Sequence, residues 1–413
     1  MQCMPSLVSI ATTTPMSDAG QAVTPDALAD AFASVPDPRR QGSIAYALPA
    51  ILTLAVTAIL ANQCSVLAIA EWGARQAPDL LRRLGFPAGR TPCQSTLQRL
   101  FAKLDGHALS AALTTSFATT VAADPATPGF QGVAIDGKAQ RGRGQYQHGG
   151  CPVHALTAYC HDSGTVLAHE PIEHGINKTE AELTVAPALI DRIDWRGRVL
   201  TGDALFCQRA LCRQVTAAGG DYLLLVRENQ PTLYQAIDLL FDPPPDSDPL
   251  PLLDRREART LERGHGRTQE VRHLVASTDL TAYLRDDLDW TGLAQVFRLE
   301  HTWLERGAAK RHLHYGITSV DCVVGPPPVL LTLKRGHWGI ENRLHRVKDV
   351  AFGEDRSLIH VGQGPTVMAL VRDTAISLLH RVGVTSIAAT LRRLSQYPEE
   401  AVNLVTQPCP TRA

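Results

Sequence analysis

The chain has 413 residues, of which 44% are hydrophobic and 20% are charged, and these proportions exclude a largely disordered protein. Its formal net charge of -1 excludes a uniformly basic nucleic-acid-binding chain, although a local basic segment would still bind phosphate. The nine cysteines include no CxxC pair, which excludes a zinc ribbon and a disulfide framework and favours a reducing cytosol. The length predicts two or three domains.

Residues 1–25 lack the basic start and the continuous apolar core of a signal peptide, and we expect a disordered leader. Residues 26–123, rich in Ala and Leu, predict an N-terminal helical domain. Within them, Ile44–Ala61 is a run of eighteen residues without a charge, which is compatible with a membrane span or with a buried helix. Pro49 and the Ala-rich composition favour the buried helix, so we expect no membrane association.

Residues 129–241 alternate between short apolar runs and amphipathic segments in the order β-β-β-α-β-α-β-α. This order predicts an α/β fold with a mixed sheet that begins with a three-stranded meander and carries helices on its faces. The first strand, FQGVAID, leads into the basic loop GKAQRGRG. The loop is interpreted either as a phosphate-binding segment or as an ordinary flexible loop.

The Pro-rich run DPPPDSDPLP, which starts at Asp242, cannot continue the preceding helix and marks a boundary in the chain. The stretches RTQEVRHLV, VFRLEHTWL and KRHLHYGITS alternate with a period of two, so residues 242–320 predict a β-rich insertion. Residues 329–400 return to helical patterns and would complete the core, with residues 401–413 as a tail.

The stretch Leu333–Ser357 contains the densest set of charged and polar groups. At 100° per residue, a helix places five side chains on one stripe beside a separate apolar stripe. The polar stripe consists of Lys334, His337, Glu341, His345 and Lys348. Two interpretations remain open: a metal and phosphate site, or a solvated amphipathic helix with i,i+4 ion pairs.

Three acids occupy notable positions in these elements. Asp136 ends the first strand, Asp203 ends the strand RVLTGDA, and Glu341 lies on the later helix. The ends of the first and fourth strands are adjacent in a sheet of this order, so two carboxylates would converge and the helix would bring a third. Carboxylates that converge in this way are ligands for hard cations such as Mg²⁺, which serve phosphoryl transfer.

Four segments together carry a resemblance to a known family: IDGKAQRG, LTGDALFCQ, GGDYLLLVRENQPTL and RGHWGIENRLHRVKDVAFGEDRS. They are similar to successive motifs of the H-repeat-associated (ISAs) family of insertion-sequence transposases, a branch of the RNase H-like DDE superfamily. The resemblance extends from about Asp26 to Val405. It implies an RNase H-like core, with Asp136, Asp203 and Glu341 as the metal-binding catalytic triad.

The resemblance also implies the cofactor and the partners. The cofactor would be Mg²⁺, with Mn²⁺ as a substitute, and the partners would be the terminal repeats of the element and a target DNA, bound by a homo-oligomer such as a dimer. Related transposases place a Tyr, an Arg and a Lys around the third acid; here Lys334, His337 and Lys348 occupy those positions. The residues expected to contact DNA are Lys138, Arg141, Arg143, Lys334, Arg335, His337, His345 and Lys348.

We therefore predict a transposase that cleaves DNA at the ends of its element and joins the freed 3′ hydroxyl to target DNA. Two alternatives remain: a DNA-binding derivative that has lost catalysis, and a nuclease without a joining step. The presence of all three acids favours an active enzyme over the first alternative.

Overall fold

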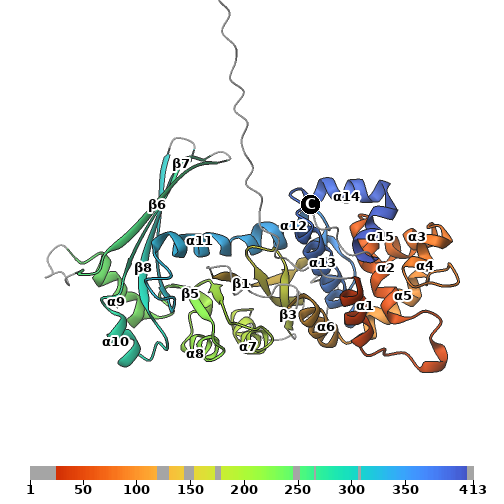
Figure 1. The fold of residues 1–413 in the computed structure, drawn as a ribbon, viewed down its shortest axis with the longest axis horizontal. Helices are drawn as coiled ribbons and strands as arrows, with labels where there is room; N and C mark the ends of the chain where they lie inside the picture. The colour runs from red at the N-terminus through yellow and green to blue at the C-terminus, as the bar shows by residue number, and fades with distance from the viewer. Residues whose placement is uncertain are drawn as a thin grey trace, which may run out of the picture.

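The computed structural model gives the arrangement of helices and strands in most of the chain (Figure 1). The predicted leader, apart from Pro25, and residues 407–413 of the predicted tail lie outside the described residues. The described residues are 25–118, 130–143, 153–172, 178–244, 252–264, 267–305 and 308–406.

The described part of the chain starts with six helices, which contribute to one apolar core. They are α1 (Pro25–Ser34), α2 (Leu48–Leu60), α3 (Val66–Ala74), α4 (Pro78–Arg83), α5 (Gln94–Lys103) and α6 (Gly106–Ala118), with a short 3₁₀ turn at Gln41–Ser43. Helix α2 is the uncharged stretch of the sequence, and it is buried on nearly all sides. It ends at Leu60, and Asn62, two residues further on, has a φ of 64°, the left-handed conformation common after a helix. No helix among the described residues is long and apolar enough to cross a membrane.

A mixed sheet forms the centre of the molecule. Strands β1 (Gln131–Gln140), β2 (Val153–Cys160) and β3 (Val166–Ile172) form the antiparallel meander, and β4 (Arg198–Gly202) and β5 (Asp221–Val226) continue it in parallel with β1. Three helices alternate with these strands in the expected order. Helix α7 (Lys178–Asp191) lies between β3 and β4, α8 (Arg209–Ala217) lies between β4 and β5, and α9 (Pro231–Phe241) follows β5. The expected fold class, an RNase H-like mixed sheet flanked by helices, is confirmed.

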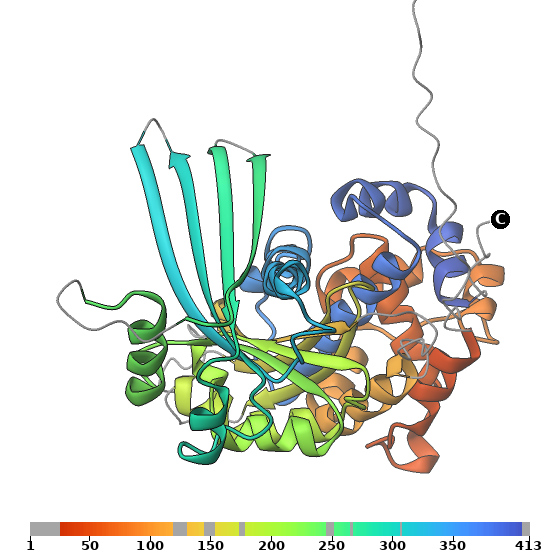
Figure 2. The same ribbon diagram turned by 60° about the vertical axis from the view of Figure 1, so that its left-hand side comes forward.

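The four strands of the insertion belong to the same sheet. They are β6 (Arg256–Gly264), β7 (Arg267–Ser277), β8 (Gln295–Glu305) and β9 (Ala308–Thr318), with helix α10 (Thr281–Asp286) between β7 and β8. The end of β9 pairs with β5, so the full order is β3-β2-β1-β4-β5-β9-β8-β7-β6. Figure 2 shows the far ends of these strands extending well beyond the core.

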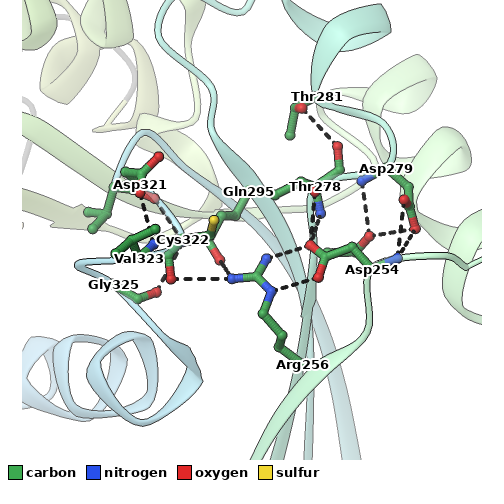
Figure 3. Close-up of polar contacts among 12 residues, drawn as sticks. Asp254, Arg256, Thr278, Asp279, Thr281, Gln295, Asp321, Cys322, Val323 and Gly325 are labelled. Atoms are coloured by element: carbon green, nitrogen blue, oxygen red, sulfur yellow. Dashed lines mark hydrogen bonds and ion pairs between the residues drawn. The ribbon is translucent and has the colours of Figure 1, made fainter.

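A polar network joins the base of the insertion to the segment that follows it (Figure 3). Asp254 holds Arg256 through two hydrogen bonds, and Arg256 Nη1 donates to Gln295 Oε1 at 2.9 Å. Gln295 Nε2 in turn donates to the carbonyl oxygens of Val320 and Gly325, at 2.8 and 3.0 Å. These bonds fix the position of the chain just before the next helix.

The final part of the chain is helical. It contains α11 (Pro327–His337), a π-helical segment (Ile340–His345), α12 (Arg346–Val350), a 3₁₀ turn (Glu354–Arg356), α13 (Gly364–Arg381), α14 (Ile387–Gln396) and α15 (Pro398–Thr406). The structure departs from the regular helix of 100° per residue that was assumed in order to place Lys334 to Lys348 on one stripe. A π turn interrupts the helix, and the helix ends before Gly353, which has a φ of 59°.

Two helical layers cover the sheet, one on each face (Figure 1). Helices α7, α8 and α9 pack on the face that carries Ile135, Leu200 and Leu224. Helix α11 packs on the opposite face, against Leu223 and Leu225 of β5. Side chains alternate along a strand, so Asp136, next to Ile135, points to the face that α11 covers. Helices α13, α14 and α15 share one apolar core with the N-terminal helices.

Candidate active site

Asp136 and Asp203 come from neighbouring parallel strands. Ala134 of β1 pairs with Thr201 of β4, so the two acids, each two residues further on, are level where the parallel pairing of these strands ends. Strand β1 itself continues to Gln140, so the expectation that Asp136 ends the first strand was wrong. Asp203 is exposed, and its Oδ1 accepts a hydrogen bond of 2.9 Å from the backbone of Leu205, which caps the turn that follows. The carboxyl ends of parallel strands are a common place for a binding site in α/β folds.

The π-helical segment brings Glu341 and His345 to Asp136. His345 Nδ1 lies 3.5 Å from Asp136 Oδ2 and 3.7 Å from Glu341 Oε1. One donor atom from each of the three residues lies within 4.8 Å of the other two, and Asp203 is not part of this group. π turns occur often at functional sites because the extra residue redirects side chains. Two carboxylates and an imidazole are a donor set that fits a divalent cation.

The side chains of Asp136, Glu341 and His345 shift one another's pKa values. Burial raises the pKa of Asp136, although a hydrogen bond to His345 opposes that effect. The hydrogen bond to His345 lowers the pKa of Glu341 to about 2, and Asp136 contributes in the same direction. Burial alone would lower the pKa of His345, but the two carboxylates outweigh burial and raise it. Titratable groups perturbed in this way are typical of functional sites.

The segment GKAQRGRG was expected to be a loop, but its first four residues belong to β1, and its basic residues have different surroundings. Lys138 Nζ lies 2.7 Å from both carboxylate oxygens of Asp349 on α12. Arg141 is exposed, and its backbone N–H donates to Asp355 Oδ1 at 3.1 Å. The side chain of Arg143 lies outside the described residues.

Helix α11 places three predicted DNA-contacting residues in distinct environments. Lys334 is 8% exposed, and burial lowers its pKa to about 8, although the charge of Asp203 opposes this shift. Arg335 forms an ion pair of 2.5 Å with Glu262 of β6. His337 is largely enclosed, its Nδ1 lies 3.2 Å from Thr201 Oγ1, and burial lowers its pKa to about 3.

Sequence reasoning missed His161, which completes this buried contact. His161 Nε2 lies 3.0 Å from Thr201 Oγ1, and burial lowers its pKa to about 4. A Cβ atom on Gly132 or Gly336 would collide with the imidazole of His161, so both glycines are needed for this close packing. The two histidines and Thr201 tie α11 to the sheet beside the acids.

Lys348 lies inside the protein rather than at a surface. Its Nζ is 2.8 Å from Asp373 Oδ1 and 3.7 Å from Glu354 Oε1, and the residue is 2% exposed. His169 Nδ1 lies 2.9 Å from the other carboxylate oxygen of Asp373, and Arg372 pairs with Glu354 at 3.2 Å. A phosphate contact by Lys348 would require this pairing to open, and that contact stays a prediction.

Two charged residues in an apolar stretch of the sequence indicate that such a network exists. Arg372 and Asp373 interrupt the otherwise apolar run VMALVRDTAISLL of α13, and charged residues inside a buried helix need partners. Nothing in the sequence alone pairs them with Lys348 and Glu354.

A groove of about 840 Å³ opens next to Asp203. Its walls come from the turn after β4, the end of β5 and the outer part of β9, including Arg227, Asn229, His312 and His314. Burial lowers the pKa of His314 to about 4, and Lys334 and Arg227 contribute to the shift. Lys334 and Arg227 therefore place positive charge near this wall, although the acids Asp203 and Glu228 also line the groove.

Comparison with known families matches two parts of the chain. Residues 29–116 match the family described as DDE_Tnp_1-associated, and residues 123–375, more than half of the chain, match the family described as Transposase DDE domain.

Individual relatives are similar over most of their length. "Putative transposase YncI" of Escherichia coli O157:H7 is 27% identical over 363 residues, which cover 85% of this chain and 87% of that protein. "H repeat-associated putative transposase YhhI" of Escherichia coli K12 is 25% identical over 354 residues, which cover 84% of this chain and 88% of that protein.

One solved structure, a piggyBac transposase in a synaptic complex with hairpin DNA, covers 94% of this chain and 83% of its own chain. Its identity is 12% and its TM-score is 0.40. The family matches confirm the resemblance to H-repeat-associated transposases. The chain therefore belongs to the transposase family that is defined by the DDE domain.

Proposed function

We propose that the protein cleaves DNA at the ends of an insertion sequence and joins the freed 3′ hydroxyl to target DNA. The observation that carries this proposal is the convergence of Asp136 and Glu341, from segments more than two hundred residues apart in the chain, beside the edge that carries Asp203. Family membership supports a DNA-processing enzyme in general. The cleavage and joining steps are our inference from the site.

Asp136, Asp203 and Glu341 would hold Mg²⁺, for which carboxylate oxygens are suitable ligands. When bound, such ions lower the pKa of water and stabilise the leaving oxygen in phosphoryl transfer. Asp136 lies within β1 and Asp203 directly follows β4, and Glu341 is held by the π segment that packs against the sheet. The protein thus positions the carboxylates before DNA arrives, which reduces the cost of reorganisation during reaction.

The groove beside Asp203 would receive a DNA strand. Arg227 lines this groove, and Lys334 is near enough to Asp203 for their charges to interact. With a pKa of about 8, Lys334 is mostly charged at neutral pH and would contact a phosphate close to the scissile bond. Since an element has two ends, we further propose that two copies of the protein act together.

Substitution of the acids tests the proposal. Asp136→Asn, Asp203→Asn and Glu341→Gln should each abolish Mg²⁺-dependent cleavage of element-end DNA, because neutral amides are poor ligands for a hard cation. Binding of the same DNA without metal should be retained. Asp289→Asn is the matched control, since Asp289 pairs with Arg213 at 2.7 Å on an exposed surface. Near wild-type cleavage by any of the three variants would remove that acid from the proposed triad.

A further inference from the structure

We propose that His345 Nδ1 is a direct ligand of the metal ion held by Asp136 and Glu341, so that this site favours Mn²⁺ over Mg²⁺. The inference rests on the proposed function and adds a nitrogen ligand to the triad. It gives His345 a metal-binding role in place of the DNA contact expected from the sequence.

The separations between the donor atoms fit a single ion. Ligand atoms about 2.0–2.2 Å from a metal lie about 3 Å apart when adjacent and about 4 Å apart when opposite. His345 Nδ1 is 3.5 Å from Asp136 Oδ2 and 3.7 Å from Glu341 Oε1, and all three donors lie within 4.8 Å of one another. A small inward movement of the side chains would therefore complete a shared site.

The position of the imidazole nitrogen supports the same role. A hydrogen bond between an imidazolium and a carboxylate is typically about 2.7–2.9 Å long, and both distances from Nδ1 exceed that range. His345 Nδ1 therefore makes two long contacts, of nearly equal length, with the two carboxylates. A cation placed between them would satisfy all three groups at once.

Burial of His345 separates it from the predicted DNA surface. Its side chain is 5% exposed, whereas that of Glu341 is 52% exposed and that of Asp136 is 25% exposed. The apolar neighbours Ile340 and Leu344 on the same segment are completely buried and hold the backbone in place. The ring is therefore fixed at the inner side of the site, where a metal ion can reach it through the more open carboxylates.

The imidazole nitrogen of His345 determines which cation this site binds more tightly. Mg²⁺ binds oxygen ligands almost exclusively, whereas imidazole suits transition metals and Mn²⁺ binds both kinds of ligand. A site of two carboxylates and one imidazole should therefore bind Mn²⁺ more tightly than Mg²⁺. The alternative is that His345 acts only as a positive counter-charge to the acids, in which case a metal ion would displace it without forming a bond.

Pulsed electron paramagnetic resonance distinguishes these cases. The full-length protein, with ¹⁵N-labelled histidine, would be loaded with Mn²⁺ alone, without DNA. We expect a ¹⁵N coupling from one directly bound imidazole, replaced by a ¹⁴N coupling in unlabelled protein. The coupling should disappear in His345→Gln with Mn²⁺ still bound, and persist in the matched control His337→Gln.

Metal titration gives a second readout. Loss of even an outer-shell partner typically costs about 10–100-fold in metal affinity, so His345→Gln should weaken Mn²⁺ binding by about tenfold or more. His345→Asp, which replaces nitrogen by oxygen, should shift the preference toward Mg²⁺.

Two results would overturn the inference: Mn²⁺ bound to the wild type without a histidine coupling, or a coupling that persists in His345→Gln. The first result needs no variant and is decisive even if the substituted proteins do not fold. Either result would leave the proposed function intact if cleavage still depends on the three acids. Loss of that dependence would instead remove the proposed function.

Discussion

The surroundings of each charged side chain decide which chemistry it can perform. Glu341 and Lys348 were predicted to share one polar stripe, yet Glu341 is exposed at the site and Lys348 is enclosed by Asp373 and Glu354. Helical periodicity places residues on a face, but it does not reveal which other segment covers that face. The sequence could therefore single out Glu341, which lies beside Asp136 in the structure, whereas it could not identify the partners of Lys348.

The burial of Lys348 leads to a prediction about stability. Lys348→Met should lower the free energy of unfolding by about 3–5 kcal/mol, because it leaves the carboxylates of Asp373 and Glu354 without their central cation. Arg346→Met is the control, since Arg346 is exposed two residues earlier and should change stability by less than about 0.5 kcal/mol. Urea denaturation measures both values. Equal stabilities, together with a smaller salt dependence of DNA binding for Lys348→Met, would instead assign Lys348 to a phosphate.

The pair of histidines around Thr201 predicts a dependence of stability on pH. The pKa values of His161 and His337 are lowered to about 4 and about 3, whereas an unfolded histidine titrates near pH 6.5. Below pH 6.5 the unfolded chain takes up protons that the folded protein cannot, so stability should fall as the pH decreases toward 4. Each histidine contributes at most about 1.4 kcal/mol per pH unit.

Denaturation midpoints between pH 7.5 and 4.5 check this dependence. His337→Gln should flatten the decline, whereas His312→Gln, at an exposed position on β9, should retain the wild-type slope. A decline of the same steepness in His337→Gln and the wild type would exclude His337 as a contributor.

Regular elements were predictable where their pattern is local. The meander β1–β3 and the alternation of β4, α8, β5 and α9 follow from apolar runs, turn residues and amphipathic segments. Strand β6 was missed because its sequence, REARTLERG, is mostly charged and polar, and its Leu261 is 68% exposed. The π turn was missed because an extra residue in a helical turn leaves the composition of the helix unchanged.

Substitutions in helix α2 test whether the uncharged stretch is buried in the core of the protein. Leu54 is 0% exposed, so Leu54→Ala should lower the free energy of unfolding by about 2–5 kcal/mol through lost burial and a new cavity. Leu67, on the neighbouring helix α3, is 46% exposed, and Leu67→Ala should have a much smaller effect. Comparable losses for the two variants, measured by urea denaturation, would contradict the packing of α2 described above.

The arrangement of the whole molecule depends on pairings between distant segments. Residues 242–320 were expected to form a β-rich insertion, and the pairing of the end of β9 with β5 makes its strands part of one continuous sheet. Likewise, α13, α14 and α15 share a core with helices from the start of the chain. No local pattern specifies such contacts. The boundaries expected for the individual domains therefore stay predictions, although the fold class was predictable.

The converging acids are proposed to carry out both cleavage and joining. To test this, the purified protein is incubated with labelled element-end DNA, a second DNA as target, and Mg²⁺ or Mn²⁺. We predict metal-dependent nicking at the element end, followed by a covalent product that links the element's 3′ end to the target, with neither product formed by Glu341→Gln. Nicked DNA without any joined product would identify a nuclease, and DNA binding without nicking in either metal would exclude both activities.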